Sequence, residues 1–351
     1  MKRNITLTGA VIMVGILALL APSRSPAADF YKGKTIRFIV GAPAGGGYDT
    51  YTRAIARHLG KHIPGNPSAV VENMDGAGSL IAANYMYNKA EPDGLTVGVW
   101  ISGQVLRQAL GDRSTRFDSR KFGWIGAPST GAPTCAIMGF TGLKTWDDVL
   151  NSKRSIRMGG MRAGTSYDDV PTILNNVAGT KFDVISGYPG TSIIRVAMQK
   201  REVEGACLGW ESMRVSNRAM LEARGDDKLI PYIIHKKVED PEVKDLPLFK
   251  EVIKGEVNLA TYNTWAASYE FQRPFTVPPN TPADRLQTLR TAFAATLRNS
   301  EFLAEAKKTR LDIEPVSGEQ IDEYVKQMTS ISDKVKQNLS FLVRSTQKRS
   351  N

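Results

Sequence analysis

Hydrophobic residues recur along this chain with two alternating periods, which predict strands and helices in turn. Residues 35–40 (T-I-R-F-I-V) are rich in β-branched and aromatic side chains, as a strand requires. Beyond them, Ile55 and Leu59 are four positions apart, which is the spacing of one helix face. The alternation continues with a strand, a helix and a strand, at 69–72, 80–88 and 95–99. This order predicts a parallel sheet with right-handed crossovers.

A second unit with the same alternation begins near Thr130. A strand at 155–159 leads through the loop 161–169 into a helix. Further strands are predicted at 182–186, 203–208 and 230–234, with a helix at 192–200. The last of these strands is expected to return to the first unit. An extended connector and two long amphipathic helices complete the chain, at 275–282, 283–299 and 318–342.

The first 28 residues have the pattern of a secretory signal peptide. Lys2 and Arg3 precede an apolar run at 5–20, and small residues follow at 25–28. The run is short for a spanning helix, which disfavours a retained membrane anchor. The mature chain is therefore expected to be exported. Its length of about 320 residues is more than a single hydrophobic core usually organises, so two lobes are expected. The predicted division is a signal peptide and two lobes, at 1–28, 29–129 with 231–351, and 130–230.

Basic residues outnumber acidic ones, but their distribution says little about function. The formal charge is +11, and removing Lys2, Arg3 and Arg24 with the signal peptide leaves +8. The charges are scattered along an exported chain, which argues against nucleic acid as a partner. A positive field modestly favours acidic ligands.

The sequence offers little for catalysis, a cofactor or a metal. Cys135 and Cys207 lie in apolar strand-like runs, which favours two separately buried thiols over one disulfide, and their spacing is not that of a metal site. No G-x-S-x-G nucleophile elbow occurs. Ser166 with Asp168 or Asp169 could serve an exported hydrolase, but no general base is evident beside them. We therefore expect a protein that is not an enzyme.

A glycine-rich loop between the first strand and the first helix is the strongest functional signal. Residues 41–49 read G-A-P-A-G-G-G-Y-D, and Asp49 can cap the helix that follows. Consecutive glycines let the backbone approach a ligand, and a helix N-terminus favours an anion. The loops at 75–79 and 101–103 open on the same edge of the sheet, where ligands of parallel sheets bind. The alternative is that the glycines only make a tight turn. Neither a phosphate-binding P-loop nor a dinucleotide fingerprint fits this sequence.

These loops, in this order, resemble those of the periplasmic receptors of tripartite tricarboxylate transporters, also called the Bug family. Members show P-G-G-G-[T/S]-D, V-E-N-x-x-G-A-G and P-D-G-Y-T, and this chain has A-G-G-G-Y-D, V-E-N-M-D-G-A-G and P-D-G-L-T at 44–49, 71–78 and 92–96. Their second-lobe G-T-[S/P] loop, V-P-Y-K-G turn and late F-x-P-x-x-T-P segment resemble 164–166, 186–190 and, loosely, 275–282. The resemblance covers nearly the whole mature chain.

The resemblance implies an α/β type II periplasmic-binding-protein fold, with two parallel-sheet lobes around a hinge and a ligand cleft. It implies a monomeric periplasmic receptor that captures a small organic acid and delivers it to inner-membrane permease subunits. A ligand sensor that docks on a membrane kinase is the alternative. In the family, amides of the first loop and hydroxyls of the second-lobe loop hold a carboxylate, often through water. The matching residues here are Gly46, Gly47, Tyr48, Asp49, Gly164, Thr165 and Ser166.

This chain departs from the family pattern at several aromatic positions. Tyr48 replaces a small hydroxyl residue, Tyr167 replaces a smaller residue, and Trp210-Glu211 stand where relatives often carry an aspartate. With Tyr188, these rings are candidate walls for an aromatic or bulky carboxylate. The alternative is that some of the rings fill the cores of the lobes.

Five further residues complete the candidate site. Arg162, beside the G-T-S loop, could contact a second carboxylate or face solvent. Glu211 would repel a carboxylate, so it could accept a ligand hydroxyl or ammonium, or cap the following helix. Gly45 belongs to the first glycine loop, and Ser79 and Ser102 belong to the two other loops at that edge.

Overall fold

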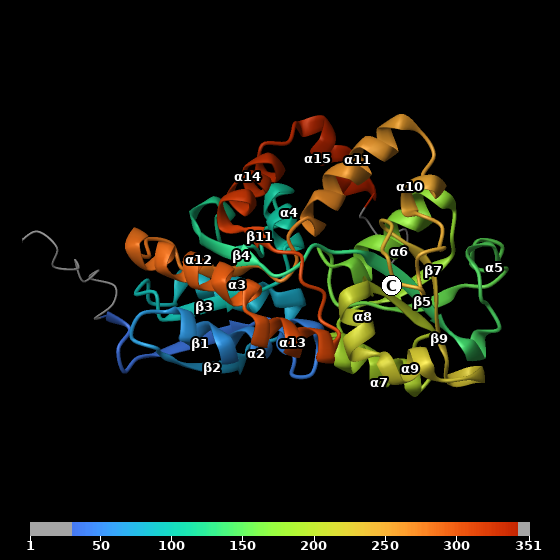
Figure 1. Ribbon diagram of the computed structural model, residues 1–351. Helices are drawn as coiled ribbons and strands as arrows, with labels where there is room; N and C mark the ends of the chain where they lie inside the picture. Colours follow the sequence, from blue (N-terminus) through green and yellow to red (C-terminus); the bar gives the residue numbers. More distant parts are fainter. Residues whose placement is uncertain (1–29, 343–351) are drawn as a thin grey trace, which may run out of the picture.

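The computed structural model describes residues 30–342, so the expected signal peptide lies outside the described residues. Two lobes lie side by side, each built on one sheet (Figure 1). The α/β class predicted from the alternation is confirmed. No helix among the described residues combines the length and the apolar character that crossing a bilayer requires.

The first lobe contains a six-stranded mixed sheet in the order β11-β4-β10-β3-β1-β2. Its strands are β1 (Thr35–Val40), β2 (Ser68–Asn73), β3 (Thr96–Val99), β4 (Gly123–Ala127), β10 (Phe275–Val277) and β11 (Val316–Ser317). β1 is parallel to β2 and β3, as predicted, but β10 is antiparallel to β3 and β4, and β11 is antiparallel to β4. The prediction of a wholly parallel sheet is wrong because β10 enters from the other lobe in the opposite direction.

The second lobe contains a five-stranded sheet in the order β7-β6-β8-β5-β9. Its strands are β5 (Pro133–Met138), β6 (Ile156–Gly159), β7 (Phe182–Ile185), β8 (Gly205–Gly209) and β9 (Leu229–Ile234). β6 is parallel to β7 and β8, whereas β5 is antiparallel to β8 and β9. β9 was expected to return to the first lobe, and that expectation is wrong. The division of the chain at residue 230 stays a prediction, but it cuts through this strand.

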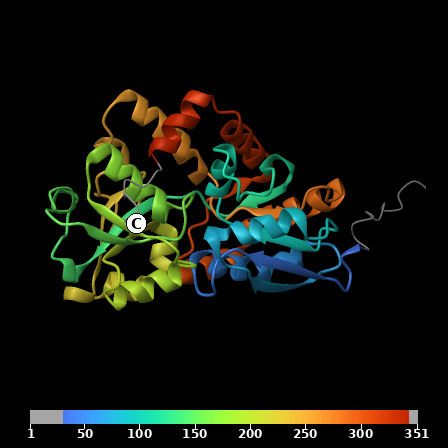
Figure 2. The ribbon, with the colours of Figure 1, turned by 180° about the vertical axis from the view of Figure 1, so that it is seen from behind.

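Helices cover both faces of the first sheet. α2 (Gly47–Leu59), α12 (Ala283–Arg298) and α13 (Ser300–Thr309) pack together on one face. α3 (Leu80–Asn88) covers the opposite face, as the view from behind shows (Figure 2), with α4 (Gly103–Ala109) and α14 (Gly318–Thr329) beside it. A single helix was expected over 318–342. It is interrupted after Thr329 because Ser332 begins a new helix, its hydroxyl accepting a hydrogen bond from the amide of Val335 at 3.4 Å.

The remaining helices belong to the second lobe or bridge to it. They are α5 (Trp146–Leu150), α6 (Ser166–Ala178), α7 (Thr191–Gln199), α8 (Trp210–Ser216), α9 (Arg218–Glu222), α10 (Phe249–Val252), α11 (Glu256–Ala266) and α15 (Asp333–Leu342). α15 packs against α11 and α6, so the end of the described chain returns from the first lobe to the second.

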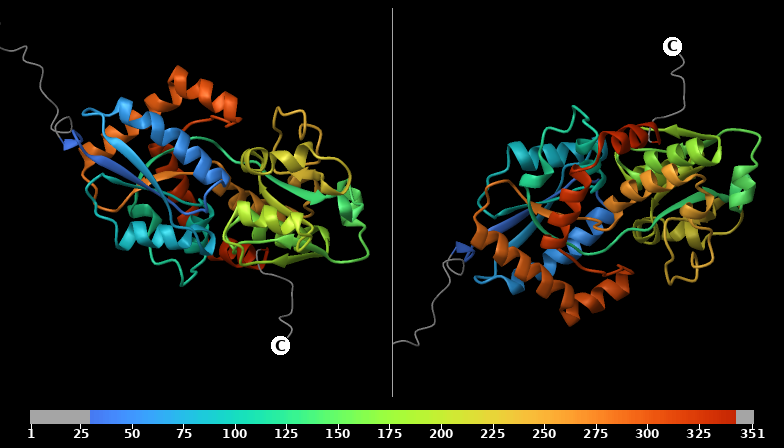
Figure 3. Two further views of the ribbon diagram at one scale, coloured as in Figure 1. Left: turned by 90° about the horizontal axis from the view of Figure 1, so that it is seen from below. Right: turned by 90° about the horizontal axis from the view of Figure 1, so that it is seen from above.

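Two neighbouring segments join the lobes, and Figure 3 shows the chain running between them. One links β4 to β5, and the other precedes β10. Ser129 and Gln272 form an isolated antiparallel bridge, in which the amide of Gln272 donates to the carbonyl of Ser129 at 2.8 Å. The amide of Gly131 donates to the carbonyl of Tyr269 at 2.6 Å. The two crossing segments therefore support each other beside the cleft.

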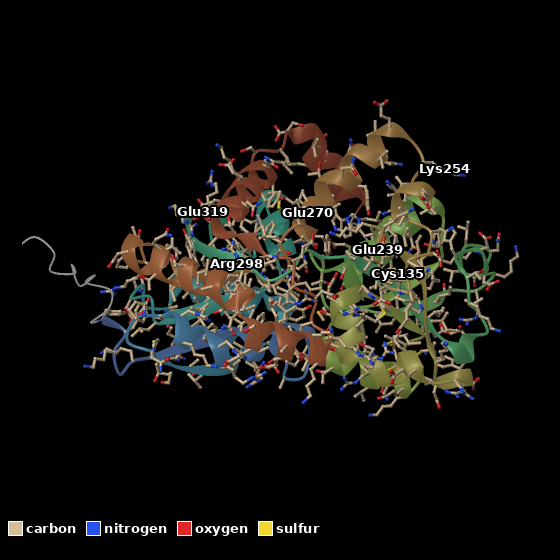
Figure 4. The ribbon with its side chains drawn as sticks, in the orientation of Figure 1. Cys135, Glu239, Lys254, Glu270, Arg298 and Glu319 are labelled. Atoms are coloured by element: carbon tan, nitrogen blue, oxygen red, sulfur yellow. A yellow bond between two sulfur atoms is a disulfide. The ribbon has the colours of Figure 1, made fainter. Side chains whose placement is uncertain are left out.

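Cys135 and Cys207 form a disulfide within the second sheet (Figure 4). They stand opposite each other on the neighbouring strands β5 and β8. Both are fully buried, as expected, but the prediction of two separate thiols is wrong. The two apolar runs are adjacent strands in matching register, and nothing in either run alone indicates that pairing.

Candidate ligand-binding site

A narrow cavity lies between the lobes and is lined from both of them. Its volume of about 40 Å³ gives room for only a few water molecules, so a small organic acid needs the lobes to move apart before it can enter. The lining residues follow strands β1, β3, β6 and β7, lie at or after the end of β8, or belong to the second crossing segment and the helix turn before it. They are Gly41, Ala42, Gly46, Gly47, Tyr48, Ile101, Met161, Thr165, Ser166, Tyr167, Pro189, Thr191, Leu208, Gly209, Ser212, Tyr269, Gln272 and Arg273.

Three helices of nine residues or more begin at this cavity. They are α2, α6 and α7, whose N-cap residues are Gly46, Thr165 and Gly190. None of the three N-caps forms a side-chain capping hydrogen bond within the described residues. The first amides of a helix have no partner inside the helix, and the helix dipole adds partial positive charge there. The cavity therefore presents amide donors and positive potential from both lobes, which suits an anion.

The first glycine loop is held by Asp49, which does not line the cavity. α2 begins at Gly47, earlier than predicted, so Asp49 lies in its first turn and Gly46 is the N-cap. The carboxylate of Asp49 accepts hydrogen bonds from the amide of Gly45 and from Arg53, both at 2.9 Å. Burial alone would raise the pKa of Asp49, but these hydrogen bonds and one from Asn73 hold it below its usual value. Asp49 and Gly45 thus shape the loop from behind.

The second-lobe loop is held by Asp168 and Asp169. Asp169 accepts from the amide of Gly164 at 2.9 Å and from the indole of Trp265 at 3.1 Å. Asp168 accepts from the amide of Met161 at 2.7 Å. Burial raises the pKa of Asp169 to about 6 and also raises that of Asp168. Gly164 itself does not line the cavity, because it packs against Gly103 and Arg107 of the first lobe.

Three tyrosines line the cavity with neutral hydroxyls. Tyr48 donates to the side-chain oxygen of Gln272 at 3.2 Å, and the hydroxyls of Tyr167 and Thr191 are 2.6 Å apart. Burial raises the pKa of Tyr48 to about 12 and raises those of Tyr167 and Tyr269 further. The wall therefore combines apolar rings with uncharged hydrogen-bonding groups.

Arg273 is the one charged side chain among the lining residues. It is only 1% exposed, and it donates to the hydroxyls of Ser129 at 2.9 Å and Ser212 at 2.7 Å. Its guanidinium carbon lies 4.3 Å from the ring centroid of Tyr51. Glu211 lies behind the lining, with one carboxylate oxygen 3.8 Å from the Arg273 guanidinium and the other accepting from the amide of Ala132 at 2.7 Å.

Of the fourteen residues predicted for the site, five line the cavity: Gly46, Gly47, Tyr48, Thr165 and Ser166. The hydroxyl of Ser79 donates to the carbonyl of Gly41, and that of Ser102 to the carbonyl of Ser268, both at 2.6 Å. Both serines support the cavity from behind. Their roles toward a ligand stay predictions, as do those of the other members of the set.

Three further members of the predicted set point elsewhere. Trp210 is fully buried in the second lobe, and its indole donates to Asp240 at 3.1 Å. Tyr188 is partly exposed, and its hydroxyl is 3.5 Å from Glu202. Arg162 reaches across to the first lobe, where it pairs with Asp112 at 3.1 Å and contacts the hydroxyl of Ser114. The alternative that some rings fill the core therefore holds for Trp210.

Sequence reasoning missed the contribution of the second crossing segment. Tyr269, Gln272 and Arg273 line the cavity, although that stretch matches no motif. A buried cation could have been suspected only from an arginine placed between two phenylalanines in the run F-Q-R-P-F. No group of three metal-ligating side chains occurs within residues 30–342.

This chain is similar in sequence to a curated protein over most of its length. No model of a protein family matches the sequence. A UPF0065 protein from the TAR-I ttuE-ttuC' intergenic region of Agrobacterium vitis is 25% identical over 296 residues, which cover 82% of this chain and 78% of that protein.

Two solved structures share the fold. The periplasmic binding protein BugD has a TM-score of 0.70 and 19% identity, covering 90% of this chain and 100% of its own. MatC (Rpa3494) from Rhodopseudomonas palustris with bound malate has a TM-score of 0.67 and 18% identity, covering 87% and 99%. These likenesses show the fold of periplasmic binding proteins. Together with the UPF0065 relative they confirm the resemblance read from the loops, and this chain is similar to the tripartite tricarboxylate receptors of the Bug family.

Proposed function

We propose that this protein is an exported receptor that holds the carboxylate of a small organic acid between its two lobes. The observation that carries the proposal is the meeting of three helix N-termini, without side-chain caps, at one cavity. Such termini favour an anion through amide donors and the helix dipole. The similarity to MatC, whose structure contains malate, supports an organic acid as the ligand.

The residues that line the cavity also indicate what kind of group the ligand carries beside its carboxylate. Met161, Leu208 and Pro189 supply apolar surface, and the rings of Tyr48 and Tyr167 stand with them. A carboxylate with an apolar or aromatic body would bury that body against these groups. We therefore keep the hypothesis of an aromatic or bulky acid, now without Trp210 and Tyr188 as walls.

The partner and the compartment are part of the same proposal. We place the mature protein in the periplasm, where it would deliver its ligand to the permease subunits of a tripartite transporter in the inner membrane. The resemblance to the Bug family and the secretory pattern of residues 1–28 support this placement. We assign the site no catalytic role, since Asp169 and Asp168 serve the loop amides instead of activating Ser166.

A thermal-shift screen of the mature protein tests the proposal. The panel contains succinate, malate, citrate, adipate and benzoate. A ligand at about 100 times its dissociation constant adds about 2.7 kcal/mol of stability, which raises the melting temperature by several degrees. A shift with at least one acid supports a carboxylate receptor. No shift with any of them, together with no organic acid released on denaturation of the purified protein, would contradict it.

A further inference from the structure

Arg273 occupies a costly position in the molecule. Its backbone φ is +58°, in the left-handed region that residues with a Cβ rarely adopt. Its side chain is almost completely buried, where an unpaired charge is strongly unfavourable. Costly backbone conformations persist mainly at functional sites, because the surrounding structure must enforce them. A buried arginine in such a conformation at the wall of the candidate site therefore needs a functional explanation.

The guanidinium of Arg273 keeps donors free at the anion-favouring end of the cavity. It has five N–H groups, and within the described residues it donates two hydrogen bonds, to Ser129 and Ser212. Its Nε has no hydrogen-bond partner in residues 30–342, although it is fully buried. Ser212 also lies against the start of α2, since a Cβ at Gly47 would be 2.8 Å from the Ser212 Cβ. The free donors and the N-terminus of α2 therefore adjoin.

Glu211 is an incomplete counter-charge for this arginine. Its Oε2 is 3.8 Å from the guanidinium, beyond a hydrogen bond, and has no hydrogen-bond partner in the described chain. Burial raises the pKa of Glu211, Arg273 lowers it, and Asp312 of the first lobe raises it. Tyr48 and Tyr51 of α2 also interact electrostatically with Glu211, and both remain neutral because burial raises their pKa. Glu211 is thus poised to change its charge when a second anion approaches Arg273.

We propose that Arg273 is the side-chain anchor of the ligand carboxylate, and that the bound anion replaces Glu211 as its counter-charge while Glu211 takes up one proton from solvent. This inference rests on the proposed function. No bond of the ligand is made or broken, and the new O–H forms on the Glu211 carboxylate. The charge of the pocket is then the same before and after binding, so the buried site never holds two uncompensated negative charges. Carboxylates therefore bind more tightly as the pH falls.

The first test compares arginine variants by isothermal titration calorimetry with malate, adipate and benzoate. Arg273→Gln removes the charge, and we expect affinity for the acids that bind to fall by on the order of 10- to 100-fold. Arg290→Gln is the matched control, because Arg290 pairs with Glu319 and Asp322 on α14, away from the cavity. A folded Arg273→Gln protein that binds within about twofold of wild type overturns the proposal.

The second test measures the number of protons that the protein takes up when the acid binds. It does not depend on the folding of an Arg273 variant. Titration of the wild type at pH 7 in two buffers of different ionisation enthalpy gives the number of protons taken up. We expect net uptake, which Glu211→Gln abolishes while raising the affinity at pH 7. Glu204→Gln is the control, since Glu204 is equally buried but lies before the opposite end of β8 and is paired with Arg154.

The outcomes separate this inference from the function on which it rests. Uptake that persists in Glu211→Gln, or no uptake in the wild type, overturns the counter-charge exchange even though the acid binds. If the wild type binds none of the five acids of the panel and releases no organic acid on denaturation, the carboxylate-receptor proposal is contradicted, and this inference with it.

Discussion

The two glycine loops that face each other across the cleft have the same construction but different support. In each, an aspartate in the first turn of the following helix accepts a hydrogen bond from an amide of the loop. Asp49 accepts from Gly45, and Asp169 accepts from Gly164, each at 2.9 Å. The common construction explains why both loops could be found as short motifs.

The difference lies in what stabilises each aspartate. Asp49 forms an ion pair with Arg53 at 2.9 Å, and its pKa is lowered. Asp169 is hydrogen-bonded to the indole of Trp265 instead, and burial raises its pKa to about 6. A carboxylate with a charged partner stays ionised through the neutral range, whereas a buried one without such a partner titrates close to it. Of the two loops, the second-lobe loop is therefore the one whose aspartate responds to pH near neutrality.

The largest effect is expected from a variant that stops the two loops from meeting. A Cβ at Gly103, at the start of α4, would overlap the carbonyl oxygen of Gly164 in the second-lobe loop. The overlap would involve the backbone of both loops, which cannot move aside as a flexible side chain can. We expect Gly103→Ala to lower carboxylate affinity by on the order of 100-fold, because the closed form becomes inaccessible. Calorimetry measures the affinity, and small-angle X-ray scattering should show a larger radius of gyration.

A control glycine is available on the first loop. A Cβ at Gly46 would meet only the carbonyl oxygen of Pro43, at 3.3 Å, within its own loop. Gly46→Ala should therefore leave the radius of gyration unchanged, because its Cβ does not stand between the lobes. An equal rise in the radius of gyration in both variants would show that added bulk acts through the local structure of each loop, and not because the loops must meet.

The pH response of the two aspartates provides the second prediction. The pKa of Asp169 is raised, so its contribution to stability is present below about pH 4 and is lost as the pH rises through about 6. Asp49 behaves in the opposite way, since its lowered pKa gives a contribution that is lost only as the pH falls below about 4. Relative to Asp169→Asn, the wild type should lose about 2 kcal/mol of unfolding free energy between pH 4.5 and 7.5.

Urea denaturation at several pH values measures this difference. The free energy of unfolding of the wild type is compared with those of Asp169→Asn and Asp49→Asn. The difference for Asp49→Asn should be nearly constant over the same range. Parallel curves for all three proteins would mean that Asp169 is ionised as easily as Asp49, and the contrast between the loops would disappear.

Local features of the fold could be predicted from the sequence, and distant pairings could not. β1 and α3 begin and end at the predicted residues, because β-branched runs and turn signals act within a few positions. The pairing of β9 with β5 and the entry of β10 from the other lobe depend on the route of the whole chain. The Cys135–Cys207 disulfide depends on the same register, so it could not be predicted either.

The candidate site divides in the same way. The glycine loops were found because they match motifs, and Gly46, Gly47, Thr165 and Ser166 line the cavity. Arg273 was not found, because the crossing segment carries no motif and meets the first loop only after more than 200 intervening residues. The hydrogen bond between Tyr48 and Gln272 spans 224 positions, a contact that only the folded chain brings about.

The smallest effect is expected from an ion pair that spans the cleft beside the second-lobe loop. Arg162 of that loop pairs with Asp112 of the first lobe at 3.1 Å, and Arg107 holds Asp112 from the other side at 2.8 Å. The Arg162 side chain is 30% exposed, so solvent screens the pair and limits its value. Because the pair exists only when the lobes are together, its loss should lower affinity through the closing equilibrium, by about fivefold in Arg162→Gln.

The matched control for this pair lies within one lobe. Arg120 pairs with Asp118 at 2.9 Å, two residues away, so Arg120→Gln removes an ion pair without touching the contact between the lobes. Stopped-flow fluorescence should show a faster ligand dissociation rate for Arg162→Gln and an unchanged rate for Arg120→Gln, because the pair between the lobes must break before the cleft opens. Equal dissociation rates in both variants and the wild type would mean that the Arg162–Asp112 pair does not help to hold the cleft closed. Backbone contacts such as that of Gly103 with Gly164 would then hold it closed.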